Sequence, residues 1–397
     1  MKSNSQKNLL ILSACLVVVM LGYGMVIPIL PFYVEQMGAG GTELGLLVAS
    51  YAIMRMICGP LWGSLSDRIG RKPVLMVGIF GYGITMVLFG LATKLWMLFL
   101  FRILAGILSS ATSPTTMAYI GDSTPEAERS KGMGTLGAAV GAGTILGPGL
   151  GGLLASDNLA IPFFIAGGFS FLSLVLIAFL LPESLSKSER IANSKNNEIR
   201  MRDTWKSASS IGMLLGMTFL ASFGVTVFFG IFGLYASQKF NAGPDAVGMI
   251  MVVFGIVTAL AQGVLTGPLT QKWGERMVIC GSLLLTAISF VLISISSSFP
   301  LFLAAIAFFT LAVSILTPAV SALISRVTTM EQGITMGLSN ASQSLGRIVG
   351  PLLGGFSYDI NLEYPNMIGA VGMGIGFLVS LWMIAIPNRG QRDFESK

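Results

Sequence analysis

The chain of 397 residues contains no histidine, only three cysteines, and charged residues at just 11% of its positions. Without an imidazole, no histidine base or histidine metal ligand is available. Cys15, Cys58 and Cys280 all lie in apolar segments and show no metal-ligand spacing, so burial as small hydrophobic side chains is the simplest interpretation. We therefore expect no metal site and no disulfide framework. The sequence also lacks most of the side chains that hydrolytic enzymes use, so a hydrolytic enzyme is not expected.

Hydrophobic residues, in contrast, make up 53% of the chain, and the mean hydropathy of +0.80 is far above that of soluble domains. Twelve apolar stretches of about 20 residues or more are long enough for a helix to cross a hydrocarbon core of about 30 Å. We expect these spans at residues 9–33, 44–64, 73–92, 96–118, 132–155, 161–181, 209–236, 246–268, 277–296, 299–324, 334–356 and 365–386. The sequence thus predicts an all-α multi-pass membrane protein.

The distribution of positive charge predicts the orientation of these spans. With the N-terminus inside, nineteen of the 24 Lys and Arg residues fall in cytoplasmic segments, and only Lys94 and Lys239 fall outside. Arg55, Arg102 and Arg347 lie within spans. Both termini are therefore expected in the cytoplasm. The net charge of +6 is explained by topology, and no nucleic-acid partner is expected because the chain lacks a solvated basic face.

The two halves of the sequence resemble each other at a nearly constant offset. Gly63 and Gly267 are 204 residues apart, and "GSLSDRIGRKPVL" aligns at this offset with "GPLTQKWGERMVI". Internal repeats of this kind are typical of transporters. We therefore predict a six-helix half over residues 1–181, a polar cytoplasmic linker over 182–208, and a second six-helix half in the same orientation over 209–397.

Two parallel six-helix halves with a charged loop after the second span resemble the major facilitator superfamily. The loop beginning at Gly63 is similar to the signature of that superfamily. "LFLFRILAG" around Arg102 and "GTILGPGLGG" from Gly143 are similar to motifs of bacterial drug:H+ antiporters, and "GYGMVIPILP" from Gly22 looks like the first helix of NorA- and TetA-type exporters. The resemblance implies export of amphipathic drugs, such as fluoroquinolones or tetracyclines, by alternating access in exchange for protons.

The same resemblance implies a secondary active transporter of the bacterial cytoplasmic membrane and not an enzyme. The sequence has no nucleotide-binding loop, so a proton gradient is the expected energy source and no cofactor is expected. The expected partners are small-molecule drugs, protons and the lipid bilayer. No feature demands an oligomer, so a monomer is expected. Transport of an anionic metabolite is the alternative function, and a membrane-embedded enzyme or receptor is a more remote one.

The charged loop contains the predicted cytoplasmic latch. Asp67 is expected near the start of the eleventh helix, whose partial positive charge favours a carboxylate. Arg71 can pair with Asp122 at the inner end of the fourth helix. Such a cluster would join the two halves on the inside, and protonation of Asp67, Asp122 or the outer Glu35 would couple protons to transport. The alternative is that the basic residues only enforce topology and that Glu35 is a solvated loop residue.

Three arginines inside the spans are the predicted binding groups for the substrate, since an ionisable residue at membrane depth usually has a function. Arg55 and Arg347 are expected near mid-depth on helices that face each other across the halves, and the resemblance implies that Arg102 lies in the cavity wall. All eighteen Asp and Glu residues fall in loops or near helix ends. We therefore predict that the arginines hold a carboxylate or enolate of the substrate. The alternative is that they bond to Asn340, Gln343 or backbone carbonyls.

Aromatic and small residues complete the predicted site. Tyr23 on the first helix and Phe223 on the seventh are predicted to contact the substrate, because soft aromatic surfaces suit ligands of varied shape. Glycines at a spacing of four let a neighbouring helix approach closely, and Pro148 permits a bend. The resemblance implies that this surface of the fifth helix meets the opposite half. The residues of this antiporter motif are Gly143, Gly147, Pro148, Gly151 and Gly152.

Overall fold

The computed structural model describes residues 2–124, 126–156, 158–185, 212–327 and 332–385. All regular secondary structure in these ranges is helical. The elements are α1 (Lys2–Val26), α2 (Leu30–Gln36), α3 (Gly41–Ile69), α4 (Arg71–Gly90), α5 (Leu95–Ser109), α6 (Thr112–Ser123), α7 (Glu126–Leu154), α8 (Ile161–Leu180), α11 (Gly212–Phe229), α12 (Phe232–Phe240), α13 (Pro244–Leu260), the short π-helix η1 (Ala261–Leu265), α14 (Thr266–Ile295), α15 (Phe299–Val327), α16 (Gln332–Ile360) and α17 (Tyr364–Ala385).

Each of the twelve predicted spans coincides with one helix or with consecutive helices, and the span 246–268 covers α13, η1 and the start of α14. Among the described residues, ten continuous helical stretches are long and apolar enough to cross a membrane. One of them, Pro244–Ile295, contains two of the predicted spans, while the more polar α16 is not among the ten. The prediction of an all-α membrane fold is confirmed.

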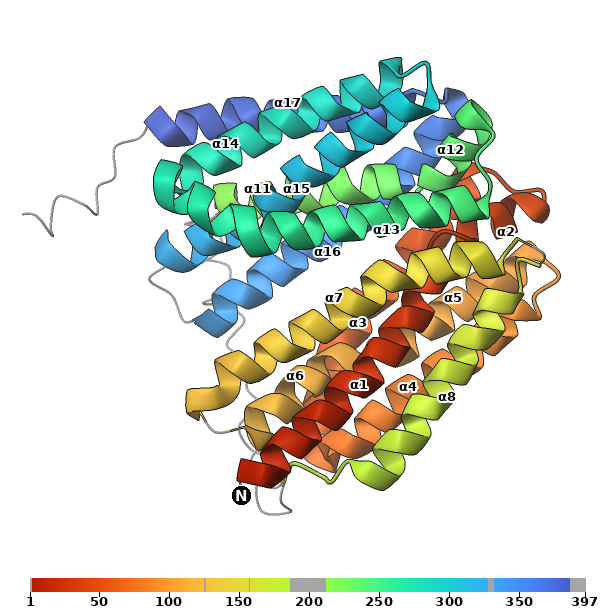
Figure 1. Ribbon diagram of the computed structural model, residues 1–397, viewed down its shortest axis with the longest axis vertical. Coiled ribbons are helices and arrows are strands. Elements are labelled where there is room, and N and C mark those ends of the chain that lie inside the picture. The colour runs from red at the N-terminus through yellow and green to blue at the C-terminus, as the bar shows by residue number, and fades with distance from the viewer. Residues whose placement is uncertain (1, 125, 157, 186–211, 328–331, 386–397) are drawn as a thin grey trace, which may run out of the picture.

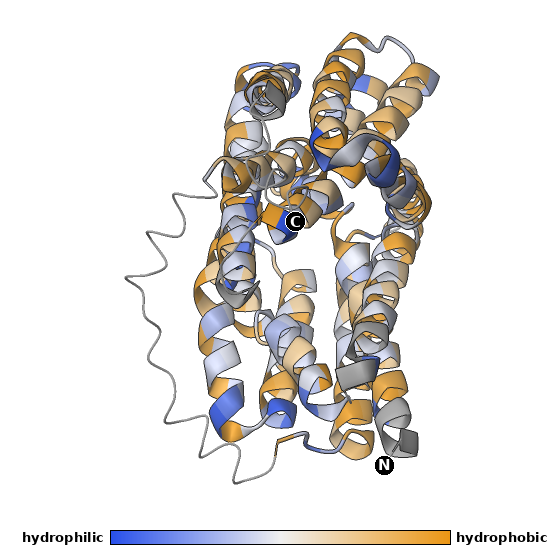
Figure 2. Cartoon of the chain, turned by 90° about the vertical axis from the view of Figure 1, so that its left-hand side faces the viewer, coloured by the Kyte–Doolittle hydropathy of each residue, from blue (hydrophilic) through white to orange (hydrophobic). Residues whose placement is uncertain are grey.

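Large hydrophobic side chains cover the outward faces of the helices. Phe179, Trp382 and Trp96 are 84%, 64% and 61% exposed. Figure 2 shows that hydrophobic residues continue along most of the helices. Apolar surface of this extent suits contact with acyl chains, and the helices satisfy their own backbone hydrogen bonds as a spanning segment must.

The helices form two bundles, one from α1 to α8 and the other from α11 to α17 (Figure 1). In the first bundle α1 packs on α7 and α8, and in the second α11 packs on α16 and α17. The glycines that follow the charged loops, Gly70 and Gly274, are 204 residues apart and both have positive φ, at 112° and 75°. The predicted boundaries at 181 and 209 remain predictions, because linker residues 186–208 lie outside the described ranges.

Two pairs of glycines bring the bundles together at one end. A Cβ added to Gly152 of α7 would lie 3.1 Å from the Cα of Gly248 of α13, and a Cβ added to Gly355 of α16 would lie 3.1 Å from the Cα of Gly45 of α3. The second pair repeats the first at an offset of 203. Both contacts lie toward the ends of the helices that are expected outside the cell, and the two bundles diverge toward the end where the N-terminus lies (Figure 1). With the N-terminus in the cytoplasm, as the positive charges predict, this arrangement of the halves is an inward-facing conformation.

The antiporter motif presents two different surfaces. Gly143, Gly147 and Gly151 lie against the backbone of α1, in their own half, whereas Gly152 and the carbonyl of Pro148 lie against α13 of the other half. The expectation that the glycines at spacing four meet the opposite half is therefore wrong. A shift of one residue on a helix turns the side chain by about 100°, so that Gly152 faces away from Gly151.

Candidate functional site

A cluster of arginine and tyrosine side chains lies between the two halves. The guanidinium carbon of Arg102 (α5) is 4.5 Å from the ring centroid of Tyr51 (α3), and that of Arg55, one turn further along α3, is 5.7 Å from the same ring. The ring of Tyr23 (α1) lies 6.3 Å from Tyr51, whose hydroxyl shares a 3.0 Å hydrogen bond with Ser109. Tyr51 thus links two arginines through cation–π contacts.

Arg347 adds a third positive charge from the other half. It interacts electrostatically with Arg55 and Tyr23, although it lies on α16, in the second bundle. Its side chain is exposed, whereas that of Arg55 is half-buried. Among the described residues, neither arginine makes a hydrogen bond to Asn340 or Gln343, so the structure lends no support to that alternative. The two halves bring Arg55 and Arg347 close to each other.

No carboxylate of the described residues balances this positive charge. Within the described ranges, the acidic residues of the helices lie in first or last turns or, like Glu275, beside the kink at Gly274. Like charges repel one another, so the cluster favours a bound anion. Tyrosine rings around the arginines offer an apolar surface with polar tips. The arrangement suits a flat organic molecule that carries an acidic group.

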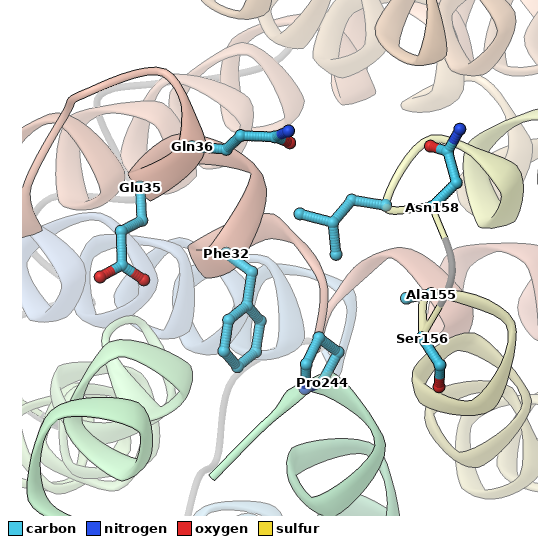
Figure 3. Close-up of a pocket in the computed structure, with 8 residues that line it drawn as sticks. Phe32, Glu35, Gln36, Ala155, Ser156, Asn158 and Pro244 are labelled. Atoms are coloured by element: carbon cyan, nitrogen blue, oxygen red, sulfur yellow. The ribbon is translucent and has the colours of Figure 1, made fainter. Parts of the chain in front are cut away.

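Two pockets lie in the described part of the protein, and the smaller one includes residues of the cluster. The larger, of about 680 Å³, lies at the outer end between the halves, and residues from α2, from the segment after α7 and from the start of α13 line it (Figure 3). Glu35 lines this open pocket and its side chain is exposed. The pocket lies at the opposite end of the helices from the charged loop that begins at Gly63. The smaller pocket, of about 120 Å³, includes Arg102, Tyr23 and Tyr82. Only the smaller pocket contains an arginine.

Phe223 does not reach either pocket. It is 5% exposed and packs in the hydrophobic core of the second half, with its ring stacked on Phe219 at 5.8 Å. A Cβ added to Gly346 would touch the backbone nitrogen of Phe223, which shows how closely α11 and α16 pack there. In the inward-facing conformation Phe223 therefore supports the wall of the second half, and its contact with substrate stays a prediction.

The charged loop forms a compact ion cluster around Arg71, which is buried. The Arg71 guanidinium contacts Asp67 at 2.6 Å and Asp122 at 2.9 Å, and it also donates to the hydroxyl of Ser66 at 2.6 Å. The predicted pairing of Arg71 with Asp122 is present. All four residues belong to the first half, so in this conformation the cluster ties α3 to α6, and among the described residues none of its ion pairs or hydrogen bonds reaches the eleventh predicted span. The latch between the halves stays a prediction.

Glu183, just after α8, completes the inner end of the first half. Its carboxylate accepts hydrogen bonds from the backbone N–H groups of Arg71 at 2.8 Å and Lys72 at 3.2 Å. A carboxylate in this position satisfies the unpaired donors at the start of α4. Sequence reasoning missed Glu183 because it lies more than 100 residues from the helix that it caps.

The second half contains the same ion pair with its charges exchanged. Glu275 and Arg326 follow Arg71 and Asp122 by 204 residues, and the Arg326 guanidinium lies 2.9 Å from Glu275. The side chain of Arg326 is 73% exposed, whereas that of Arg71 is 7% exposed. The repeat alignment places Glu275 opposite Arg71, so this exchange was visible in the sequence.

An acid also joins the two halves at the outer end. The carboxylate of Asp359, at the end of α16, accepts hydrogen bonds of 2.8 Å from the N–H groups of Gly41 and Thr42, the first residues of α3. Asp359 therefore caps a helix of the opposite half. Each helix of the pair α3 and α16 thus has an acid near its C-terminus, Asp67 at the inner end of α3 and Asp359 at the outer end of α16. In this structure Asp359 caps the partner helix.

Glu363 lies in the outer loop between α16 and α17 and forms an ion pair with Lys239. Lys239 donates to its carboxylate at 2.7 Å, and the hydroxyls of Ser294 and Tyr235 donate at 2.5 and 3.0 Å. Burial raises the pKa of Glu363, but hydrogen bonds from Lys239, Ser294, Tyr235 and Asn366 outweigh this effect and leave the pKa below its ordinary value. Lys239, the one basic residue of the second half that is predicted outside, could have indicated this site from the sequence.

Comparison with known proteins places this geometry in a family. The profile of the Major Facilitator Superfamily matches residues 12–217 and 214–397. Multidrug resistance protein 2 of Bacillus subtilis is 33% identical over 384 residues, which cover 96% of each chain. Quinolone resistance protein NorA of Staphylococcus aureus is 28% identical over 94% of this chain and 95% of its own. The crystal structure of a bacterial homologue of the human lysosomal transporter Spinster, inward-facing and unoccupied, superposes with a TM-score of 0.78 at 14% identity, covering 96% of this chain and 98% of the other.

Proposed function

The chain belongs to the Major Facilitator Superfamily and is a multi-pass membrane transporter, and from this premise we propose that it exports amphipathic drugs that carry an acidic group, by alternating access and in exchange for protons. Relatives named for multidrug and quinolone resistance support the substrate class. Because those relatives are bacterial, the proposed location is the bacterial cytoplasmic membrane. Fluoroquinolones and tetracyclines, which carry a carboxylate and an enolate respectively, fit this description.

The observation that supports an acidic substrate is the convergence of Arg55, Arg102 and Arg347 around Tyr51 and Tyr23. A purely cationic drug would enter this region against three positive charges and would find no carboxylate there among the described residues. An anion, by contrast, would replace lost water with guanidinium donors, which bind carboxylates in a two-pronged geometry. The cluster therefore favours acidic drugs over cations such as ethidium.

The proposed transport cycle alternates between two closures of the same helix pair. In the inward-facing conformation Asp359 caps α3 and the glycine pairs hold the outer ends together. In the outward-facing conformation these contacts would separate, and Asp67 would reach the first turn of α16 as the reciprocal cap. Protonation of Asp67, or of Asp122 in the cluster that positions it, would weaken this cap on α16 and favour return to the inward-facing state. Glu35 is the proposed acceptor of protons from the outer side.

The test uses inside-out vesicles with an imposed proton gradient. We expect uptake of norfloxacin and tetracycline that stops when an uncoupler collapses the gradient, and much weaker uptake of ethidium. Arg55→Gln and Arg347→Gln should each reduce uptake of the acidic drugs at least tenfold, because a charge-assisted hydrogen bond contributes about 1.5–3 kcal/mol. Lys94→Gln, which removes one positive charge from an exposed outer loop, is the matched control.

Two outcomes would contradict the proposal. If both arginine variants transported norfloxacin and ethidium with unchanged relative rates, the arginines would not bind the acidic group. If uptake persisted without a proton gradient, proton exchange would not drive transport.

Transport of a smaller anionic metabolite is the second candidate function. It is favoured by the same uncompensated arginines and by the volume of the pocket at Arg102, about 120 Å³, which is below the range of about 300–1,000 Å³ typical of drug-sized sites. Competition separates the two candidates. If amphipathic drugs are the true substrates, small carboxylates without a large apolar group should inhibit drug uptake poorly. If a small anionic metabolite is the true substrate, the same carboxylates should inhibit drug uptake strongly.

A further inference from the structure

The small pocket beside Arg102 is built like a binding site for a single anionic group. Its polar lining consists of Arg102 from α5, Tyr82 from α4 and Tyr23 from α1. The other lining residues are Gly230, which presents only backbone, and six apolar residues, Val26, Ile27, Leu30, Pro31, Leu44 and Val48. Three polar tips therefore converge in a space of about 120 Å³ with hydrophobic walls.

Two side chains that line this pocket carry a buried polar atom without a hydrogen-bond partner among the described residues. These atoms are the Nε of Arg102 and the hydroxyl of Tyr82, and the two residues are only 7% and 4% exposed. Tyr51 covers one face of the Arg102 guanidinium and so supplies no acceptor to its edge. Unpaired buried donors are costly, and most are satisfied in folded proteins. Two of them on side chains that line one small cavity indicate a missing acceptor.

The chemistry of the donors defines the ligand. A guanidinium can only donate hydrogen bonds, and a tyrosine hydroxyl beside it donates to an acceptor that bears negative charge. The apolar walls offer nothing to a hydrated cation or to an ammonium group. We propose that this pocket binds one carboxylate, and that its occupant during transport is the acidic group of the exported molecule.

The pocket is also placed for release to the outside. Gly230, from the break between α11 and α12 of the second half, closes one side of it. Nearby, a Cβ added to Gly233 of α12 would lie 2.7 Å from Pro31 of α2, so the outer closure of the two halves lies directly beyond the pocket. Separation of the halves at the outer end would remove Gly230 from the pocket and expose the carboxylate. In this last step the inference rests on the proposed function.

Tyr82→Phe tests the pocket in two independent measurements. The full-length protein is placed in nanodiscs of zwitterionic lipid, and benzoate and chloride are titrated by calorimetry. We expect about tenfold weaker benzoate binding, the fold-change of one lost charge-assisted hydrogen bond. Without ligand, the thermal unfolding midpoint should stay the same or rise, because the variant loses a buried hydroxyl that had no partner.

Tyr33→Phe is the matched control. The Tyr33 hydroxyl donates to the carbonyls of Phe89 and Ala92 at 3.1 Å, so its removal should lower the unfolding midpoint and leave benzoate affinity unchanged. Arg102→Gln should abolish benzoate binding, which checks the charge separately from the hydroxyl.

The outcomes distinguish this proposal from the proposed function. Unchanged benzoate affinity in Tyr82→Phe would overturn the pocket, while transport that depends on Arg55 and Arg347 would still stand. Benzoate binding that depends on Tyr82, in a protein that moves no acidic drug, would support the pocket and overturn the export proposal. If chloride bound there and benzoate did not, the occupant would be a free inorganic anion and the assignment to the substrate would be overturned.

Discussion

A methyl group added to Gly152 should push the inward-facing conformation toward the outward-facing one. The Cβ of Gly152→Ala would lie 2.5 Å from the carbonyl oxygen of Pro244 and 3.1 Å from the Cα of Gly248, both in the opposite half. Ordinary contact begins at about 3.4 Å, so the helices α7 and α13 must separate locally by about 0.9 Å, which is 3.4 minus 2.5. Both neighbours are backbone atoms, which cannot give way as a flexible side chain would.

The expected shift follows from the cost of overpacking. Extra methyl groups in a well-packed contact cost about 1–3 kcal/mol. The whole cost applies to the inward-facing conformation. In the outward-facing conformation the outer ends of α7 and α13 are apart, so the added methyl group meets no backbone atom of the opposite half. The ratio of outward- to inward-facing molecules should therefore rise about 5- to 150-fold.

Distances between spin labels at the outer ends measure this ratio. Thr93→Cys and Ser297→Cys place labels on exposed outer loops of the two halves, at positions 204 residues apart. The background carries Cys15→Ala, Cys58→Ala and Cys280→Ala, so that only the two introduced thiols react. Double electron–electron resonance should show a larger population of long distances in Gly152→Ala.

Gly141→Ala is the control on the same helix. A Cβ at Gly141 would meet nothing within 4 Å, so this variant should keep the distance distribution of the parent protein. If Gly152→Ala gave the same distribution as Gly141→Ala, the contact between α7 and α13 would not hold the outer ends together, and the reasoning would be refuted.

Three further predictions follow from the ion pairs and caps. Asp359→Asn should favour the outward-facing state by about 1 kcal/mol through loss of the charged cap on α3, measured with the same labels; an unchanged distribution would contradict the outer cap. Arg71→Gln should lower the free energy of unfolding by about 1.5–3 kcal/mol, because it removes a buried guanidinium that bonds to two partly exposed acids, Asp67 and Asp122. The repeat-related Arg326→Gln should cost under about 1 kcal/mol, because its partner contact is solvent-exposed, and equal effects in detergent unfolding would argue against this difference in burial. The lowered pKa of Glu363 means that the stability it contributes is complete above about pH 4.3 and is lost as the pH falls through its folded pKa. The difference in unfolding midpoint between the parent protein and Glu363→Gln should therefore narrow on acidification below about pH 4.3, and a difference that stays constant with pH would exclude Glu363 as the titrating group.

The membrane class, the helical spans and the repeat could all be predicted from the amino-acid sequence. Long apolar runs leave a helix few alternatives in lipid, because each backbone polar group must be satisfied within its own segment. The pairing of Arg71 with Asp122 was also within reach, since both residues lie at the inner ends of adjacent helices. The spacing of Tyr51 and Arg55, one helical turn apart, could have revealed their cation–π contact.

Which charges meet and which surfaces face each other depends on how the helices pack and could not be predicted from the sequence. Gly151 and Gly152 are neighbours in sequence, yet they pack against different halves, because the rotation of α7 about its axis depends on its contacts with both α1 and α13. Asp359 and Gly41 are 318 residues apart, and the unpaired donors of a helix start give no local sign of the acid that will cap them. The pocket of Arg102 and Tyr82 likewise depends on the approach of two helices and on a break in the opposite half. Contacts of this kind arise from the packing of whole elements, for which neither periodicity nor composition carries a signal.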